Sequence, residues 1–160
     1  MQLEIFTTGG TIDKIYFDAK STFEVGEPQI LEVLREANLS IDYRVTPLLR
    51  KDSLEMTDED RGLVRQAVEQ STASQIVITH GTDTMIATAK ALADLPGKAI
   101  VLTGAMQPAR FRFTDAVFNI ACAMMAAQTL PAGVYIAMNG RIFNPGSVRK
   151  NVEMNRFEDV

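Results

Sequence analysis

Histidine, cysteine and positive charge are in short supply in this sequence, and each shortage excludes a class of function. The single histidine, His80, rules out metal sites rich in histidine and the His-Glu-x-x-His motif of zinc hydrolases. The single cysteine, Cys122, rules out an intrachain disulfide, and its apolar neighbours favour a buried, unreactive thiol. The net charge of −4 argues against nucleic acid or an anionic membrane as a main partner, since both require a basic surface.

Long apolar segments and nucleotide-binding glycine motifs are also missing. The N-terminus has no basic segment followed by a long apolar one, as a signal peptide would. The longest apolar stretch, residues 116–138, is interrupted by Asn119, Gln128 and Pro131 and is not a clean membrane span. Neither Gly-x-Gly-x-x-Gly nor Gly-x-x-x-x-Gly-Lys-Ser/Thr occurs, so nothing supports nucleotide binding. We therefore expect a cytoplasmic protein that does not associate with membranes.

The order of the periodic segments predicts an α/β fold. The chain has 160 residues, which fits a single domain over residues 1–160. Strand-like and helix-like segments alternate, which predicts a mostly parallel sheet with helices on both faces and right-handed connections. The expected strands are residues 2–8, 41–49, 75–79, 99–103 and 133–138, and the expected helices are 28–37, 57–70, 83–95 and 115–128.

Two helix starts and the C-terminal end carry local signals. Thr57 with Asp60 resembles a capping box, and Asp83 is a candidate cap for the helix that would run to Leu95. Turn signals at Asn139-Gly140 and Pro145-Gly146 predict a small hairpin followed by an arm over residues 139–160.

Glycine-containing loops follow three of the predicted strands. Residues 7–11 read Thr-Thr-Gly-Gly-Thr, residues 80–84 read His-Gly-Thr-Asp-Thr, and residues 104–106 read Gly-Ala-Met. The carboxyl ends of parallel strands meet at one edge of a sheet, where ligands bind. Glycines let the backbone approach a ligand and leave amide N–H groups free, and a helix beginning near Asp83 would suit an anion such as a carboxylate. A plain turn is the alternative for either threonine loop alone, but the pair favours a ligand site.

The residue types at this edge favour threonine chemistry. His80 could act as a base, although a structural role in holding the Gly81 turn is the favoured interpretation. A threonine hydroxyl is inert until a base takes its proton, and a partly desolvated lysine can do so. Lys150 follows the last predicted strand and its hairpin, so it could fold back over the sheet edge. From the sequence alone, a solvated surface lysine is the favoured alternative.

The two threonine loops together resemble the signature motifs of bacterial-type L-asparaginases and glutaminase-asparaginases. The matching segments are Thr8–Ile12 and His80–Met85, in the family's order, and the pair is far more specific than either alone. Three further segments of the chain resemble, in order, the family's substrate-carboxylate loop, its Gly-Ala-Met loop and its lysine segment. They are Asp52–Met56, Gly104–Pro108, and Val148–Lys150 with Phe157 downstream.

The resemblance implies a flavodoxin-like, three-layer domain that hydrolyses the side-chain amide of L-asparagine, or a related amide, through an acyl-threonine. It implies Thr11 as the primary nucleophile, with Thr82, Asp83 and Lys150 as the second catalytic group. In that group the lysine activates the threonine hydroxyl, and the aspartate orients the lysine and binds the substrate's α-amino group. The residues implied in substrate binding are Gly10, Ser53, Glu55, Gly81 and Ala105. No metal and no organic cofactor are implied, and the partners expected are the small amide substrate and further copies of the chain in a homo-oligomer.

Two departures from the family pattern leave alternatives open. Family members usually run to about twice this length, taking roughly 150 residues as one domain, and the resemblance covers only their N-terminal domain. The family's lid also carries a tyrosine that relays a proton from the nucleophile, whereas Phe23 stands at that position and Tyr16 is the nearest tyrosine. One alternative is therefore a weak or inactive module that binds aspartate or asparagine. Another is an enzyme for larger amides, such as peptide-linked or nucleotide-linked asparagine or glutamine.

Overall fold

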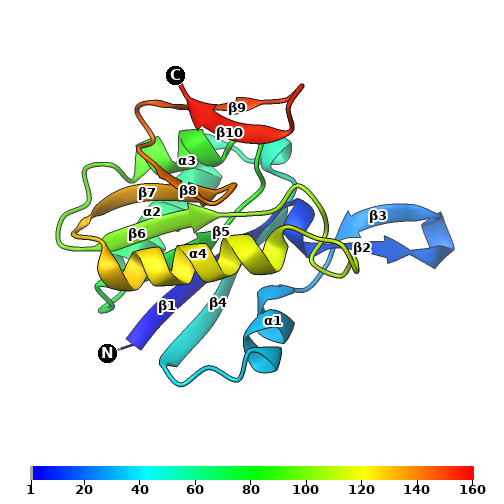
Figure 1. Cartoon of the computed structure of the whole chain (residues 1–160), viewed down its shortest axis with the longest axis horizontal. Coiled ribbons are helices and arrows are strands. Elements are labelled where there is room, and N and C mark those ends of the chain that lie inside the picture. The colour runs from blue at the N-terminus through cyan, green and yellow to red at the C-terminus, as the bar shows by residue number, and fades with distance from the viewer. Residues whose placement is uncertain (1) are drawn as a thin grey trace.

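A six-stranded sheet forms the centre of the computed structural model, which describes residues 2–160 (Figure 1). The strand order is β4-β1-β5-β6-β7-β8, in which the first five strands are parallel and β8 is antiparallel to β7. The strands are β1 (Gln2–Gly9), β4 (Asp42–Lys51), β5 (Gln75–Thr79), β6 (Ala99–Thr103), β7 (Gly133–Met138) and β8 (Arg141–Phe143).

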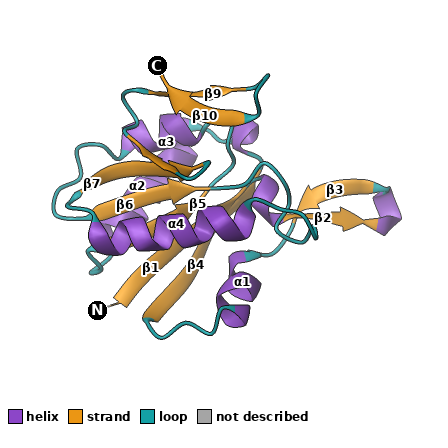
Figure 2. Ribbon diagram, in the orientation of Figure 1, coloured by secondary structure: helices purple, strands orange, loops and turns teal. Residues whose placement is uncertain are grey.

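Helices cover both faces of this sheet, as the alternating pattern predicts (Figure 2). One apolar cluster packs α2 and α3 against the sheet, and a second cluster packs α1 and α4 against the opposite face. Successive strand residues supply the two clusters in turn, because side chains alternate across a strand: Ile76 and Ile78 belong to the first cluster and Val77 to the second. The helices are α1 (Ile30–Glu36), α2 (Asp58–Gln70), α3 (Met85–Ala91) and α4 (Ala116–Thr129).

The predicted capping box at the start of α2 is present. Thr57 Oγ1 accepts a hydrogen bond from the Asp60 N–H at 3.2 Å, and the Asp60 carboxylate accepts one from the Thr57 N–H at 2.9 Å. Two donors that a helix leaves unpaired at its first turn are thereby satisfied.

The prediction for the helix after β5 is wrong at both ends. Its first residue is Met85, and the Asp83 side chain makes no capping bond because its carboxylate pairs with Lys150. After Ala91 the chain tightens into turns in which the N–H groups of Leu92 and Ala93 bond carbonyls three residues back, so the helix does not reach Leu95.

A hairpin that the sequence did not predict follows β1. A short 3-10 helix, η1 (Thr11–Asp13), leads into the antiparallel strands β2 (Lys14–Phe17) and β3 (Thr22–Val25), which a second 3-10 turn, η2 (Asp18–Lys20), connects. This β2–β3 hairpin projects away from the sheet (Figure 1). Its strands have only four residues each, too short to show a clear alternating pattern in the sequence.

After the turn at Asn139-Gly140, where the sequence predicts a small hairpin, the C-terminal segment folds back onto the sheet. Strands β9 (Val148–Asn151) and β10 (Arg156–Asp159) form a further antiparallel hairpin. Val148 and Phe157 are buried in the cluster that contains α2 and α3, and the Phe157 ring lies 6.5 Å from the Phe143 ring. This packing fixes the position of Lys150, which belongs to β9.

Candidate active site

Four loops meet at the carboxyl ends of neighbouring parallel strands, and we refer to them together as the loop cluster. They follow β1, β4, β5 and β6, which are adjacent in the sheet. The loop cluster comprises Gly9–Thr11, Asp52–Ser53, His80–Asp83 and Gly104–Ala105. Its position is the edge at which open α/β sheets bind ligands.

A shift of strand register lets the first of these loops leave the sheet. β1 and β4 pair residue by residue up to Thr7 and Pro47, but Gly9 is opposite Lys51, so β4 has additional residues there. The Gly10 N–H then donates to the Lys51 carbonyl at 2.9 Å. That amide is therefore not available to a ligand, contrary to the expectation that the glycine amides of this loop are free.

Glycine is required at positions 10 and 81 because the loops touch through their backbones. Gly10 has a φ of +87°, and a Cβ there would overlap with the backbone of Gly81. A Cβ at Gly81 would lie 2.6 Å from Cβ and Oγ of Ser53. The turn that carries Thr11, the turn that carries Thr82 and the Ser53 loop are thus in direct contact.

His80 has the structural role that the sequence favoured. Its ring is fully buried, with Nδ1 2.7 Å from the Gly81 carbonyl oxygen and Nε2 2.8 Å from Thr88 Oγ1. A carbonyl only accepts, so Nδ1 donates to it and Nε2 accepts from the threonine hydroxyl. Burial lowers the pKa of His80 from 6.5 to about 4, because a charged ring in the interior would lack the hydration that stabilises it in water. The ring is therefore neutral near neutral pH and holds the Gly81 turn.

Lys150 comes back over the sheet edge to the second threonine loop. Its Nζ lies 2.8 Å from Thr82 Oγ1 and 2.7 Å from the Asp83 carboxylate, and its side chain is only 17% exposed. The three residues predicted as the second catalytic group are therefore joined by hydrogen bonds, although Lys150 is 68 positions from Thr82 and 67 from Asp83 in the chain.

Ser53 is buried against the turn that carries Thr82, whereas Glu55 is exposed. Thr84 donates to the Ser53 carbonyl through its hydroxyl at 2.7 Å and to the Ser53 Oγ through its N–H at 3.3 Å. Ser53 opens a 3-10 helix, η3 (Ser53–Glu55), that Asp52 caps by accepting from the Leu54 N–H. Glu55 is exposed at the end of that turn, so the structure does not bring it into the loop cluster.

The remaining predicted residues differ in how closely they join the loop cluster. Thr11 is half-buried as the first residue of η1, directly after Gly10. Ala105, in the loop after β6, is buried. Tyr16 is 52% exposed on the β2–β3 hairpin, where it is paired across the strands with Phe23 and its ring lies 5.4 Å from that ring. Tyr16 and Phe23 of the β2–β3 hairpin are therefore direct neighbours.

Three residues that support the loop cluster were not found from the sequence. The Asp115 carboxylate accepts from the N–H groups of Met106 and Gln107 and from the side-chain amide of Asn119, which also donates to the Gly104 carbonyl at 2.9 Å. The spacing of four residues at the start of α4 was the available signal for the Asp115–Asn119 pair.

Lys14 is the third supporting residue, and its Nζ lies 3.0 Å from the Asp52 carboxylate. Burial alone would raise the pKa of Asp52, but the Lys14 ammonium and the Leu54 N–H outweigh burial and lower that pKa below its usual value. The carboxylate therefore stays charged, and it ties the base of the hairpin to the Ser53 loop.

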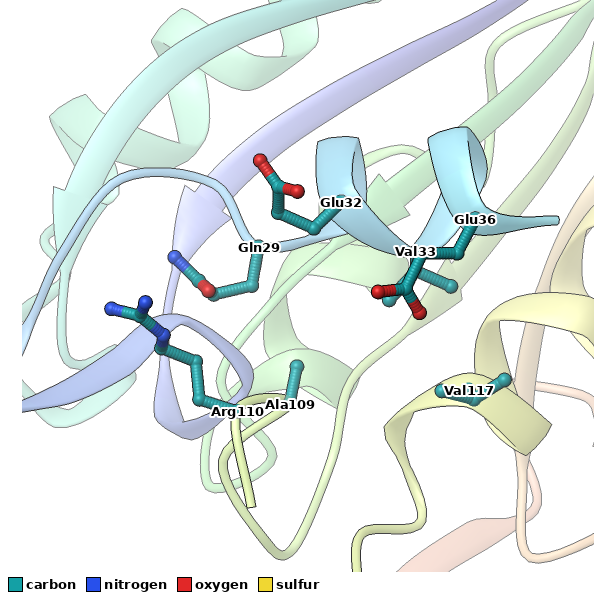
Figure 3. A pocket seen from close by; sticks show the side chains of 7 residues that line it. All are labelled: Gln29, Glu32, Val33, Glu36, Ala109, Arg110 and Val117. Carbon is teal, nitrogen blue, oxygen red and sulfur yellow. The ribbon is translucent and has the colours of Figure 1, made fainter. Parts of the chain in front are cut away.

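A separate pocket lies away from the loop cluster. It has a volume of about 410 Å³ between α1, the segment before α4 and the start of α4, and Gln29 and Arg110 point toward one another at one side of it (Figure 3). None of Thr11, Thr82 and Lys150 lines it. Within residues 2–160 there is no cluster of three or more histidine, cysteine, aspartate or glutamate side chains that could hold a metal ion. No helix in the same part of the chain has the length and apolar character needed to cross a bilayer.

Similar proteins are found by family, by sequence and by structure. Residues 2–158 match the family described as Asparaginase, N-terminal. An L-asparaginase of Thermococcus kodakarensis is 31% identical over the whole chain, and a Glutamyl-tRNA(Gln) amidotransferase subunit of Methanosarcina barkeri is 32% identical over 87% of it. The chain covers 51% of the first relative and 34% of the second. The solved structure of the Thermococcus kodakarensis thermostable L-asparaginase superimposes with a TM-score of 0.89 at 28% identity, over 100% of this chain and 51% of that one.

Proposed function

Because the chain belongs to the asparaginase family, whose N-terminal domain it matches, we propose that it hydrolyses the side-chain amide of L-asparagine, or of a related amide, through a covalent ester on Thr11. The observation that carries this proposal is the Thr82–Asp83–Lys150 cluster, whose turn is in contact with the turn that carries Thr11. A threonine nucleophile requires a base close by to take its proton, and a lysine amine can serve as that base.

In the first half of the reaction, the Thr11 oxygen attacks the amide carbon and its hydroxyl proton leaves. The C–N bond then breaks, the nitrogen takes up a proton, and ammonia departs from an acyl-threonine ester. Backbone N–H groups of the Thr82 and Ala105 segments would stabilise the negative charge that develops on the carbonyl oxygen.

In the second half, water attacks the ester and releases the carboxylate and Thr11. As placed, the Lys150 amine donates to Thr82 Oγ1, which leaves the threonine's own hydrogen free to point at the substrate. Thr82 can therefore give this hydrogen to the substrate while its oxygen takes a proton from Lys150, and Asp83 keeps the amine in place. The reverse transfer requires the amine to accept from the Thr82 hydroxyl instead of donating to it. The buried Ser53 hydroxyl is the proposed partner of the substrate's α-carboxylate.

Release of ammonia from L-asparagine by the purified chain tests the proposal. Thr11→Ala, Thr82→Ala and Lys150→Met should each lower kcat by about 10²–10⁴-fold, the usual worth of positioned proton transfer. Thr129→Ala is the matched control, because that hydroxyl only donates to the Met125 carbonyl on the exposed surface of α4. Turnover that survives Thr11→Ala unchanged would remove Thr11 as the nucleophile.

A second candidate function is binding of aspartate or asparagine without efficient turnover. Phe23 supports it, because the hairpin then presents no hydroxyl at the position where the family has its relay tyrosine, and Tyr16 is half-exposed beside it. Calorimetry with L-aspartate together with the ammonia assay separates the two functions. Binding without ammonia release favours the binding module.

The identity of the amide is a further open choice within the first proposal. The relative named as a Glutamyl-tRNA(Gln) amidotransferase subunit supports testing amides larger than free asparagine. Assays with free, peptide-linked and nucleotide-linked asparagine and glutamine would rank them. A single domain, a homo-oligomer and a cytoplasmic location stay predictions, and sedimentation of the purified chain tests the oligomer.

A further inference from the structure

Asp13 is a buried carboxyl group that the proposed reaction does not use. It is the last residue of η1, two positions after Thr11, and only 2% of it is exposed. Carboxyl groups are rarely buried to this degree without a specific partner. The sequence pattern assigned no role to Asp13.

The polar groups of Asp13 join the two ends of the β2–β3 hairpin. Its N–H donates to the Gly10 carbonyl at 3.1 Å, on the side of the nucleophile turn. Its own carbonyl accepts from the Gly26 N–H at 2.8 Å, and its Oδ1 accepts from the Gln29 N–H at 2.8 Å. One residue therefore binds both the turn before the hairpin and the chain just after it.

The rest of the hairpin stem is tightly packed, while the strands beyond it extend away from the sheet (Figure 2). A Cβ at Gly26 would lie 2.9 Å from Ile15 Cδ1, so the chain passes close to the base of β2 there. The Lys14–Asp52 ion pair is a second tie at this base. The direction in which the hairpin leaves the loop cluster is thus set within these few residues.

We propose that Asp13 is a positioning residue: its carboxyl group, anchored on the Gln29 N–H, holds the backbone at position 13, whose bonds to Gly10 and Gly26 fix the Thr11 turn and the hairpin in one relative orientation. This inference rests on the proposed function, in which Thr11 must meet the substrate carbonyl in a defined geometry. A misplaced nucleophile would raise the barrier of the covalent step, while the substrate-binding groups at Ser53 would stay where they are.

The surroundings of Asp13 also make its charge sensitive to pH. Burial raises the pKa of Asp13 from 3.8 to about 7, and the negative charge of Glu27 adds to this increase. The Gln29 N–H and the Arg50 guanidinium act in the opposite direction but do not cancel it. Arg50 of β4 and Glu27 after β3 are the charged groups that act on it, and they are ion-paired with one another. A pocket of about 210 Å³, lined in part by Asp13 and Arg50, adjoins the carboxyl group.

Two substitutions and one control test the positioning role. Asp13→Ala removes the acceptor for Gln29, and we expect kcat to fall by about 10- to 100-fold with a much smaller change in KM, since misplacement by about 1 Å can have that effect. Asp13→Asn keeps an oxygen at Oδ1, so its kcat should be much closer to that of the wild type than the kcat of Asp13→Ala is. Because the amide cannot ionise, any inflection of kcat near pH 7 should be absent in this variant. Glu4→Gln is the control: Glu4 is also buried and accepts from Thr46 and Ser71, far from the carboxyl end of β1.

The pH dependence of stability provides an independent measurement. Because the folded pKa lies above the ordinary value, the contribution of Asp13 to stability is fully present below pH 3.8 and is lost as the pH rises to about 7. The melting temperature of the wild type relative to Asp13→Asn should therefore fall across that window and level off above it. Asp13→Ala with unchanged kcat and only a lower melting temperature would reduce Asp13 to a structural residue and overturn the proposal.

Limited trypsin digestion separates this inference from the proposed function. If no amide is hydrolysed even by the wild type, the proposed function fails, but the hairpin can still be probed at Lys20, which lies at its exposed tip. We expect Asp13→Ala, and not Glu4→Gln, to speed cleavage after Lys20 several-fold because the stem is loosened. Equal cleavage rates in all three proteins would overturn the positioning role.

Discussion

The loop cluster and the β2–β3 hairpin both contribute to the candidate site, yet they are built in opposite ways. In the loop cluster, glycines at positions 10 and 81 let backbones touch, and His80 and Ser53 are completely enclosed. On the hairpin, the rings of Tyr16 and Phe23 are about half exposed, with Phe23 meeting Phe111 edge-on at 5.7 Å. One region is determined by close packing and the other by a few contacts at its base.

This difference indicates where the site can change without unfolding. The loops of the loop cluster restrain one another through direct contacts. Thr82 is therefore held in one position beside Lys150, as a catalytic group requires. A hairpin with an exposed aromatic face can move, or be altered in sequence, at little cost to the sheet. We therefore expect substitutions on the hairpin to be tolerated by the fold, and substitutions in the loop cluster to affect both the fold and the position of the Thr82–Asp83–Lys150 group.

The largest effect is expected from Gly10→Ala in the loop cluster. The new Cβ would overlap with the Gly81 backbone and would also require a φ of +87°, so we expect a loss of about 3 kcal/mol or more in the free energy of unfolding. Gly97→Ala is the matched control, because Gly97 has a φ of +73° but nothing within 4 Å of a Cβ. Urea unfolding of both variants separates overlap from backbone strain. Equal losses would mean that packing between the loops contributes little.

An intermediate effect, visible through its pH dependence, is expected from His80→Gln. Because burial lowers the pKa of His80 to about 4, its contribution to stability is present above its ordinary pKa of 6.5 and is lost as the pH falls through about 4. The stability of the wild type relative to the variant should fall in that window. Thermal melts in a series of buffers would measure it, and a difference independent of pH would contradict the buried, neutral histidine.

Much of the loop cluster could be predicted because its signals are local. Buried strands such as residues 75–79 end in glycine–threonine loops, and parallel strands bring such loops to one edge. Lys150 could not be placed by such reasoning, since its approach to Thr82 depends on Val148 and Phe157 packing against the sheet. A resemblance to a family supplied that residue, and the packing explains it.

The hairpin was missed for a related reason. Four-residue strands leave too few positions for an alternating pattern, and their stability comes from contacts at the stem such as those of Asp13. Asp83 was misread as a helix cap because a capping aspartate and an aspartate paired with a distant lysine look the same in sequence. Local patterns do not reveal partners far apart in the chain, and the pairing of Asp83 with Lys150 was expected only from the family resemblance.

The smallest effect on stability is expected from Phe23→Tyr, which returns a hydroxyl to the position of the family's relay tyrosine. The ring is 49% exposed, so one added oxygen should change the free energy of unfolding by less than about 0.5 kcal/mol. If proton relay limits the covalent step, kcat for L-asparagine should rise by about 10-fold or more. Phe113→Tyr makes the same change on a ring that is 81% exposed in the loop before α4 and should alter neither quantity. A loss of stability comparable to that of Gly10→Ala would show that the hairpin is as tightly determined as the loop cluster, because only a closely packed ring resists so small an addition.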